Sequence, residues 1–248
     1  MERATVLGRL TWQPAHVVGV VAETPRAKTI ALDVPGWPGH RAGQHVDVRL
    51  TAEDGYQAER SYSIASAPDG TRVALTVVRI GDGEVSPYLT GELQPGDQIE
   101  LRGPVGGYFV WEPPLGGPLL LIAGGSGVAP LMAMIRLRAA AGTEVDTRLL
   151  LSSRSWDEVI YRDELQRLTG NGLTVVHTLT ASQPPGWAGY ARRVDAGMLA
   201  EVGPGPAERP RVFVCGPTPF AEAVAEALVQ LGHQPQHIKT ERFGPTGS

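Results

Sequence analysis

Hydrophobic and polar residues follow two different patterns along the chain. In its first half, short runs such as residues 16–21, 45–50 and 72–79 alternate apolar with polar side chains. A period of two is typical of half-buried antiparallel strands. Because Pro-Gly and Asp-Gly pairs separate the runs, we expect about six strands, folded as a small sandwich or barrel.

The second half alternates apolar strands with segments of helical length. A Pro- and Gly-rich connector at residues 111–118 separates the two patterns. We therefore place an antiparallel β-domain at residues 12–112 and a parallel α/β-domain at residues 117–248. Apolar runs and capping residues predict the following elements: strand 119–123, helix 129–141, strand 145–152, a helix from a capping box at Ser155 and Glu158 to about residue 168, strand 173–180, strand 211–215, and helix 221–231, with Thr218 as N-cap and Pro219 at the first helical position.

Composition excludes several classes of function. The formal net charge of −4, without long runs of like charge, argues against binding to nucleic acid or to an anionic membrane. The single cysteine, Cys215, excludes an internal disulfide framework and a cysteine-ligated iron–sulfur cluster in this chain. Apolar runs are too short for a membrane span, so we expect a cytoplasmic protein. The histidines show no ligand spacing, and we assign no metal.

Two motifs in the second half predict a nucleotide site. The first lies between an apolar strand and a helix and consists of Gly124, Gly125, Ser126, Gly127, Val128, Ala129 and Pro130. Glycines there let the backbone approach a pyrophosphate at a helix N-terminus, and the alternative is a tight turn without a ligand. The second motif, Cys215, Gly216 and Pro217, ends a later strand. Ligands lie beyond the carboxyl ends of such strands, so Cys215 should face the same crevice; the alternative is a small buried side chain.

One motif in the first half suits a flat, phosphate-bearing ligand. Arg60, Ser61, Tyr62 and Ser63 combine a cation, two hydroxyls and an aromatic ring on one strand. Such a set can bind a phosphate, hydrogen-bond a ring edge and stack on a heterocycle. An ordinary edge strand with one packed aromatic side chain is the alternative.

Taken in order, these motifs resemble those of the ferredoxin–NADP reductase superfamily over nearly the whole chain. Residues 60–63 match its flavin motif Arg-x-Tyr-Ser/Thr, residues 83–89 its G-x-x-S-x-x-L helix opening, and residues 103–109 its G-P-x-G turn with one additional glycine. The resemblance implies a six-stranded antiparallel Greek-key barrel that holds FAD, followed by a parallel-sheet α/β-domain that binds NAD(P)H. FMN in place of FAD stays open.

The resemblance also implies residue roles. Arg60 would bind the flavin diphosphate, Tyr62 would lie against the isoalloxazine, and Ser63 would lie near flavin N5. Cys215 would lie beside nicotinamide C4, with Glu241 or Phe243 over the other face of the ring. Ser63, Cys215 and Glu241 are thus the catalytic candidates. The backbone of Thr76, Val77, Val78 and Arg79 would line the flavin, and Val85 with Ser86 would meet a phosphate at a helix N-terminus. Further FAD contacts are expected from Ser61, Gly83, Glu84 and Phe243.

The nicotinamide cofactor is predicted from the strand after the glycine loop. Glu144 and Asp146 have the spacing of an acid that binds the NAD ribose, but they begin this strand and so belong to the opposite edge of the sheet. Ser153 and Arg154 stand at its carboxyl end, followed by Tyr161 on the next predicted helix. This set suits a 2′-phosphate and resembles the family's NADP set, so we expect NADPH. If Arg154 is instead only a solvated loop cation, NADH stays open as the cofactor.

These expectations describe an enzyme that transfers a hydride from NAD(P)H to bound FAD. The electrons then pass to a separate acceptor, a small redox protein such as a ferredoxin, a haem protein or a monooxygenase component. Two alternatives stay open: a reductase of free flavin or small oxidants, and a non-catalytic flavin-binding electron-transfer or sensor module.

Overall fold

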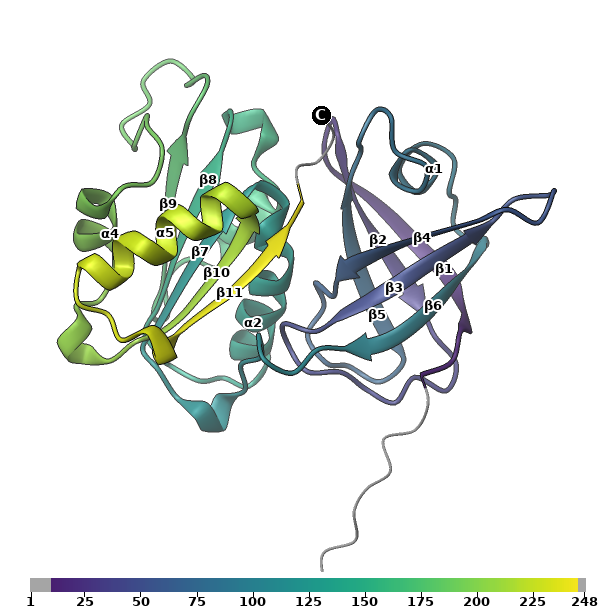
Figure 1. Cartoon of the computed structure of the whole chain (residues 1–248), viewed down its shortest axis with the longest axis horizontal. Helices are drawn as coiled ribbons and strands as arrows, with labels where there is room; N and C mark the ends of the chain where they lie inside the picture. Colours follow the sequence, from purple (N-terminus) through teal and green to yellow (C-terminus); the bar gives the residue numbers. More distant parts are fainter. Residues whose placement is uncertain (1–9, 245–248) are drawn as a thin grey trace, which may run out of the picture.

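The computed structural model describes residues 10–244, which form two sheets, one in each half of the chain (Figure 1). The first sheet contains β1 (Gln13–Thr24), β2 (Ala27–Asp33), β3 (His45–Thr51), β4 (Gln57–Ser63), β5 (Arg72–Val78) and β6 (Gln98–Val105). Its order is β4-β3-β6-β1-β2-β5, with antiparallel neighbours throughout. A bridge between Ile64 and Leu75 joins the two edge strands, so the sheet closes as a barrel. The short helix α1 (Ser86–Gly91) follows β5.

Alternation of side chains explains the barrel. In β5, Val73, Leu75 and Val77 are buried and belong to the apolar cluster inside the barrel. Thr76 has the opposite orientation expected of a strand position between them, yet it is only 5% exposed. The other half of the molecule covers this part of the outer surface. The predicted six-stranded antiparallel barrel is confirmed.

The second sheet is parallel throughout, in the order β11-β10-β7-β8-β9. Its strands are β7 (Leu119–Gly124), β8 (Thr147–Ser153), β9 (Leu173–Leu179), β10 (Arg211–Pro217) and β11 (Ile238–Phe243). Its helices are α2 (Val128–Ala140), α3 (Arg162–Leu168), α4 (Ala196–Val202) and α5 (Thr218–Gln230). One apolar cluster packs α2 and α3 on one face, and a second packs α4 and α5 on the other. The central strand β7 is buried at every position, as its continuous apolar run predicts.

Two predicted helix starts are wrong. The helix expected from Ser155 is a 3₁₀ turn at Trp156–Glu158, and α3 begins only at Arg162. Tyr161 adopts a left-handed conformation between them, with φ 59°, and this interrupts the helix. In α5, Pro217 is the N-cap and Thr218 is already helical; its hydroxyl donates to the Phe243 carbonyl at 3.3 Å instead of capping the helix. Neither α4 nor β11 was among the predicted elements.

The two halves pack directly against each other, with α2 beside the barrel (Figure 1). The apolar cluster around α2 also contains Ala27, Ala65 and Phe109, which precede the second sheet in the chain. Phe109 meets Phe213 of β10 edge-on, with 5.3 Å between ring centroids. A continuous core of this kind fixes the walls of the space between the sheets. Within residues 10–244, no helix has the length and apolar character needed to cross a membrane.

Candidate functional site

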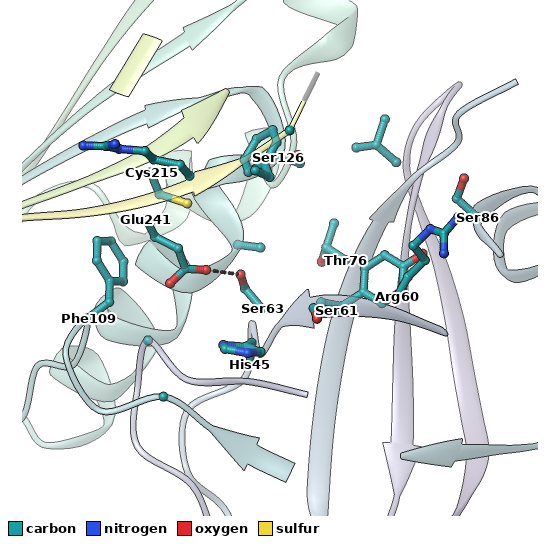
Figure 2. A pocket seen from close by; sticks show the side chains of 18 of the residues that line it. His45, Arg60, Ser61, Ser63, Thr76, Ser86, Phe109, Ser126, Cys215 and Glu241 are labelled. Carbon is teal, nitrogen blue, oxygen red and sulfur yellow. Dashed lines mark hydrogen bonds between the residues drawn. The ribbon is translucent and has the colours of Figure 1, made fainter. Parts of the chain in front are cut away.

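A cavity of about 700 Å³ lies between the two halves, within the size range of cofactor pockets. Both sheets contribute to it, together with the loops at their ends (Figure 2). The barrel supplies Gly43, His45, Arg60, Ser61, Tyr62, Ser63, Thr76, Val78, Ile80, Gly83, Glu84, Val85, Ser86, Gly106, Gly107, Tyr108 and Phe109. The α/β half supplies Ser126, Ala129, Cys215, Thr240, Glu241, Arg242, Phe243 and Gly244.

Strand β4 carries all four residues of the predicted flavin motif to this cavity. The Arg60 side chain is 55% exposed and contacts the Glu84 carboxylate at 3.3 Å, a weak surface pair that a phosphate can replace. The Tyr62 ring is partly buried, and this burial raises the pKa of its phenol to about 12. Ser61 donates to Asp47 at 2.6 Å. The strand thus presents a solvated cation and a neutral aromatic ring side by side.

The segment after β4 meets the predictions only in part. Thr76, Val78, Gly83, Glu84, Val85 and Ser86 line the cavity as expected. Val77 and Arg79, whose backbone was expected to contact the flavin, are not among the lining residues, and the Val77 side chain is fully buried inside the barrel. Arg79 is exposed. Its backbone N–H donates to the Arg26 carbonyl, and its own carbonyl accepts from the Arg26 guanidinium. The Ser86 hydroxyl accepts a hydrogen bond from the Ile80 N–H at 3.0 Å, which fixes the loop before α1.

The glycine loop lies between β7 and α2, on the α/β side of the cavity. Gly125–Gly127 is a 3₁₀ turn that leads from β7 into α2, and Gly125 has φ +55°. A Cβ on Gly127 would lie 2.1 Å from the carbonyl oxygen of Cys215. The loop therefore packs directly on the backbone of the Cys-Gly-Pro motif, which brings the two predicted nucleotide motifs together. Within the loop, Ser126 and Ala129 reach the cavity, whereas Val128 and Pro130 are buried in the first turn of α2.

Residues from three strands meet where the two halves face each other (Figure 2). Cys215 of β10 lies opposite Glu241 of β11 in the parallel register. Ser63, the last residue of β4, donates its hydroxyl hydrogen to Glu241 Oε1 at 3.0 Å. Burial raises the pKa of Glu241, while the Ser63 hydrogen bond and the charge of His45 oppose this shift. Burial, assisted by the charge of Glu241, also raises the pKa of Cys215 well above its usual value, so the thiol is protonated and not a nucleophile.

Several residues that line the cavity were not among the predicted site residues. His45 pairs with Ser63 across β3 and β4 and lies beside it in the cavity. Gly106, Gly107 and Tyr108 also line the cavity. The G-P-x-G turn was a usable signal for these last three. No local signal marks His45, because its place depends on the pairing of two strands.

The predicted 2′-phosphate set is only partly assembled. Ser153 is 6% exposed at the end of β8, and its hydroxyl has no hydrogen-bond partner among the described residues. The Arg154 side chain is 76% exposed, 3.9 Å from Glu158. Tyr161 corrects the prediction: it is 1% exposed, and its hydroxyl is hydrogen-bonded to Thr76 of the barrel. A side chain held inside the junction is not available to a nucleotide phosphate.

Comparison with known proteins agrees with this division of the site. A family model described as an oxidoreductase FAD-binding domain matches residues 28–110, and an oxidoreductase NAD-binding domain matches residues 121–226. Ferredoxin–NADP reductase B of Sorangium cellulosum is 36% identical over 211 residues, which cover 82% of this chain and 84% of that protein. The glycine betaine monooxygenase reductase subunit of Chromohalobacter salexigens is 34% identical over 92% of this chain, which spans only 63% of that relative.

A solved structure shows the same arrangement of both halves. The cytochrome P450 reductase of Amycolatopsis has a TM-score of 0.82 and 26% identity, covering 96% of this chain and 71% of its own. The chain belongs to the ferredoxin–NADP reductase superfamily of two-domain oxidoreductases, with FAD and a nicotinamide dinucleotide as the cofactors of its two domains.

The residues around the cavity fit these cofactors. The barrel wall offers a solvated guanidinium for a diphosphate, an aromatic face for a flat ring, and the Ser63 hydroxyl where the two halves meet. The opposite wall offers a glycine loop at the start of α2, where backbone N–H groups can meet a pyrophosphate. Both donor sets face one space, which a flavin and a nicotinamide ring must share.

Proposed function

We propose that this chain takes a hydride from NAD(P)H onto FAD and passes the electrons to a separate protein acceptor. The observation that carries the proposal is the contact of Ser63 from the barrel with Glu241 from the α/β sheet, with Cys215 directly beside it. Bound FAD supplies the redox chemistry, because it accepts a hydride and can release the electrons singly. The protein's contribution is to bring the two rings to a distance of about 3–3.5 Å.

Each wall has a separate task in this proposal. Arg60 holds the flavin diphosphate, Tyr62 lies against the flavin ring, and the Ser63 hydroxyl lies near N5. The glycine loop holds the nicotinamide dinucleotide, whose ring lies beside the Cys215 thiol. The thiol is only 1% exposed, so it offers a small, neutral surface that keeps water from the transfer path.

The proposed acceptor is a component of an oxygenase system. Two of the similar proteins carry this role in their names, one as the reductase subunit of a monooxygenase and one as a cytochrome P450 reductase. The sequence given has one cysteine, so a cysteine-ligated iron–sulfur cluster, where the system uses one, lies outside these residues. Reduction of free flavin is the second candidate and is favoured by the openness of the cavity toward Arg60, whose side chain is 55% exposed.

The experiment that tests this function mixes the FAD-loaded protein with NADPH under nitrogen. The visible absorption band of the flavin is expected to disappear within the dead time of the instrument or within seconds after mixing. A flavin that stays oxidised would contradict the proposal and favour a binding module. Cytochrome c or free FMN is then added at the same NADPH concentration, and the steady-state rates of their reduction are compared. A faster rate with cytochrome c indicates a protein acceptor, and a faster rate with FMN indicates a small one.

We propose NADPH as the preferred cofactor, in support of which Ser153 and Arg154 stand at the carboxyl end of β8. The Arg154 guanidinium, 3.9 Å from its nearest carboxylate, can turn toward a 2′-phosphate. Arg154→Ala is expected to raise KM for NADPH about tenfold, the loss of a contact worth roughly 1.5 kcal/mol, and to leave KM for NADH unchanged. Arg167→Ala, which removes an exposed cation from α3, is the matched control. Equal changes for both nucleotides would count against this site.

A further inference from the structure

A chain of hydrogen bonds joins the α/β half to the barrel at Tyr161. This residue lies between the 3₁₀ turn and α3 and is 1% exposed. Its hydroxyl is hydrogen-bonded to Thr76 of β5, whose hydroxyl is 2.8 Å from that of Thr29 in β2. Thr29 donates to Glu23 Oε1 at 2.7 Å, and Glu23 Oε2 accepts the backbone N–H of Tyr161 at 3.2 Å. The network therefore leaves Tyr161, passes through three barrel strands, β5, β2 and β1, and returns to the Tyr161 backbone.

The direction of each bond in this network follows from the number of hydrogens. A hydroxyl has one hydrogen to donate, and that of Thr29 goes to Glu23. Thr29 must then accept from Thr76, and Thr76 must accept from Tyr161. Burial raises the pKa of Tyr161 to about 12, so the phenol keeps the hydrogen that it donates. All three hydroxyls point toward the carboxylate, an order in which each bond polarises the next.

Arg136 of α2 adds a second connection to the same place. Its guanidinium lies 4.9 Å from the centre of the Tyr161 ring and pairs with Glu164 of α3 at 2.6 Å. It also donates to the carbonyl of Ala65 at 2.8 Å. Ala65 stands two residues after Ser63, and α2 begins at the glycine loop. The Arg136 connection thus runs from the helix that follows the glycine loop to the segment that follows Ser63, and the Tyr161 connection ends at Thr76, which lines the cavity.

The backbone of Tyr161 supports a role beyond packing. It has φ 59° and ψ 25°, a left-handed conformation that is unusual for an aromatic residue and persists only where surrounding contacts impose it. The conformation ends the 3₁₀ turn, and the hydroxyl meets Thr76 on the outer surface of the barrel. A longer helix from Ser155 would lack this interruption and would leave Thr76 without its partner.

We propose that Tyr161 and Arg136 are positioning residues, which hold the two walls of the cavity at the separation that hydride transfer requires. With Glu23, Thr29 and Thr76, they form what we call the interdomain latch. This inference rests on the proposed function, because only a reaction between two bound rings depends on the distance between the walls. A 1 Å error in such a distance can cost about 10²-fold in rate.

Tyr161→Phe tests the latch, because it deletes the donating hydroxyl and keeps the ring under Arg136. In anaerobic stopped-flow mixing with saturating NADPH, the limiting rate of flavin reduction is expected to fall about tenfold. The FAD content and the NADPH concentration at half-saturation should stay within about twofold of wild type. Tyr190→Phe is the matched control, since it removes a phenol that donates to Glu201 within the α/β half.

A readout independent of the cofactors is hydrogen–deuterium exchange in the flavin-free protein. Tyr161→Phe keeps the backbone N–H that donates to Glu23 but deletes the hydroxyl bonded to Thr76. With one of its two attachments to the barrel lost, residues 155–168 should exchange their amides faster in Tyr161→Phe and not in Tyr190→Phe. Unchanged exchange would overturn the latch. Faster exchange with a wild-type rate of flavin reduction would overturn its positioning role. Failure of the wild-type flavin to accept electrons from NADPH would instead overturn the proposed function.

Thr29→Val is the second variant, because it breaks the middle of the chain from a residue outside the cavity. It should slow flavin reduction in the same direction. Combined with Tyr161→Phe, it should slow the reaction no more than the stronger single change, since both remove one connected chain. Additive losses would overturn the chain of hydrogen bonds as a unit, and this variant also decides the question should Tyr161→Phe fail to fold.

Discussion

Replacing Gly127 by alanine is expected to reduce kcat/KM with NADPH by at least about 10²-fold while FAD stays in the barrel. The added Cβ would lie 2.1 Å from the Cys215 carbonyl oxygen and 2.9 Å from the Gly216 N. Backbone atoms cannot rotate away as a flexible side chain can, so the loop must move off β10 by about 1 Å or more. That movement displaces both nucleotide motifs at once. Steady-state kinetics and the flavin absorbance of the purified variant give the two measurements.

Gly197→Ala is the matched control for this substitution. It adds the same methyl group within α4, where the nearest atom is the Asp195 Oδ1 at 3.4 Å. Activity should be retained, and the free energy of unfolding should change by less than about 1 kcal/mol. Wild-type kcat/KM in Gly127→Ala would show that the loop does not bind the dinucleotide in the way proposed.

Periodicity in the sequence predicted the two halves and most of their strands, but not α4 or β11. The alternation in residues 72–79 and the apolar run in residues 119–123 are each determined by the environment of a single strand. Both therefore predict their element without knowledge of its neighbours. The proximity of the glycine loop and the Cys-Gly-Pro motif could also be predicted, because parallel strands bring their carboxyl ends to the same edge of the sheet.

Contacts between the halves could not be predicted in the same way. Ser63 and Glu241 are 178 positions apart, and nothing local to either residue indicates the other. Tyr161 shows the opposite error: its position near Arg154 favoured the nucleotide site, whereas its backbone is left-handed and its hydroxyl meets Thr76 on the outer surface of the barrel. Sequence spacing does not indicate this orientation of the Tyr161 ring, because tertiary contacts impose it.

The junction combines rigid packing with a few polar contacts at the cavity. Phe109 and Phe213 pack deep in it, whereas Ser63 and Glu241 meet at the edge where the rings would lie. A packed core resists small displacements more strongly than a few hydrogen bonds do. The apolar core therefore sets the overall placement of the halves, and the polar contacts adjust the geometry at the reacting atoms.

Ser63→Ala is expected to slow flavin reduction by NADPH about 10²-fold without loss of FAD, because it removes the hydroxyl proposed to lie at flavin N5. The same change should alter the pH dependence. The Ser63 hydrogen bond lowers the pKa of Glu241 against the effect of burial, so its loss raises that pKa further. An inflection due to Glu241 should move to higher pH in Ser63→Ala and disappear in Glu241→Gln. Stopped-flow reduction across the pH range measures both.

Ser63→Thr is the informative companion, because it keeps a hydroxyl on a strand that accepts a β-branched side chain. It should recover most of the rate and the wild-type position of the inflection. The groups that face the Glu241 carboxylate are the Ser63 hydroxyl from β4, the His45 ring from β3 and the Cys215 thiol from β10. A shift to higher pH in His45→Gln would show that the charge of that ring also lowers the pKa of Glu241. A Ser63→Ala profile identical to wild type would remove the contact from the mechanism.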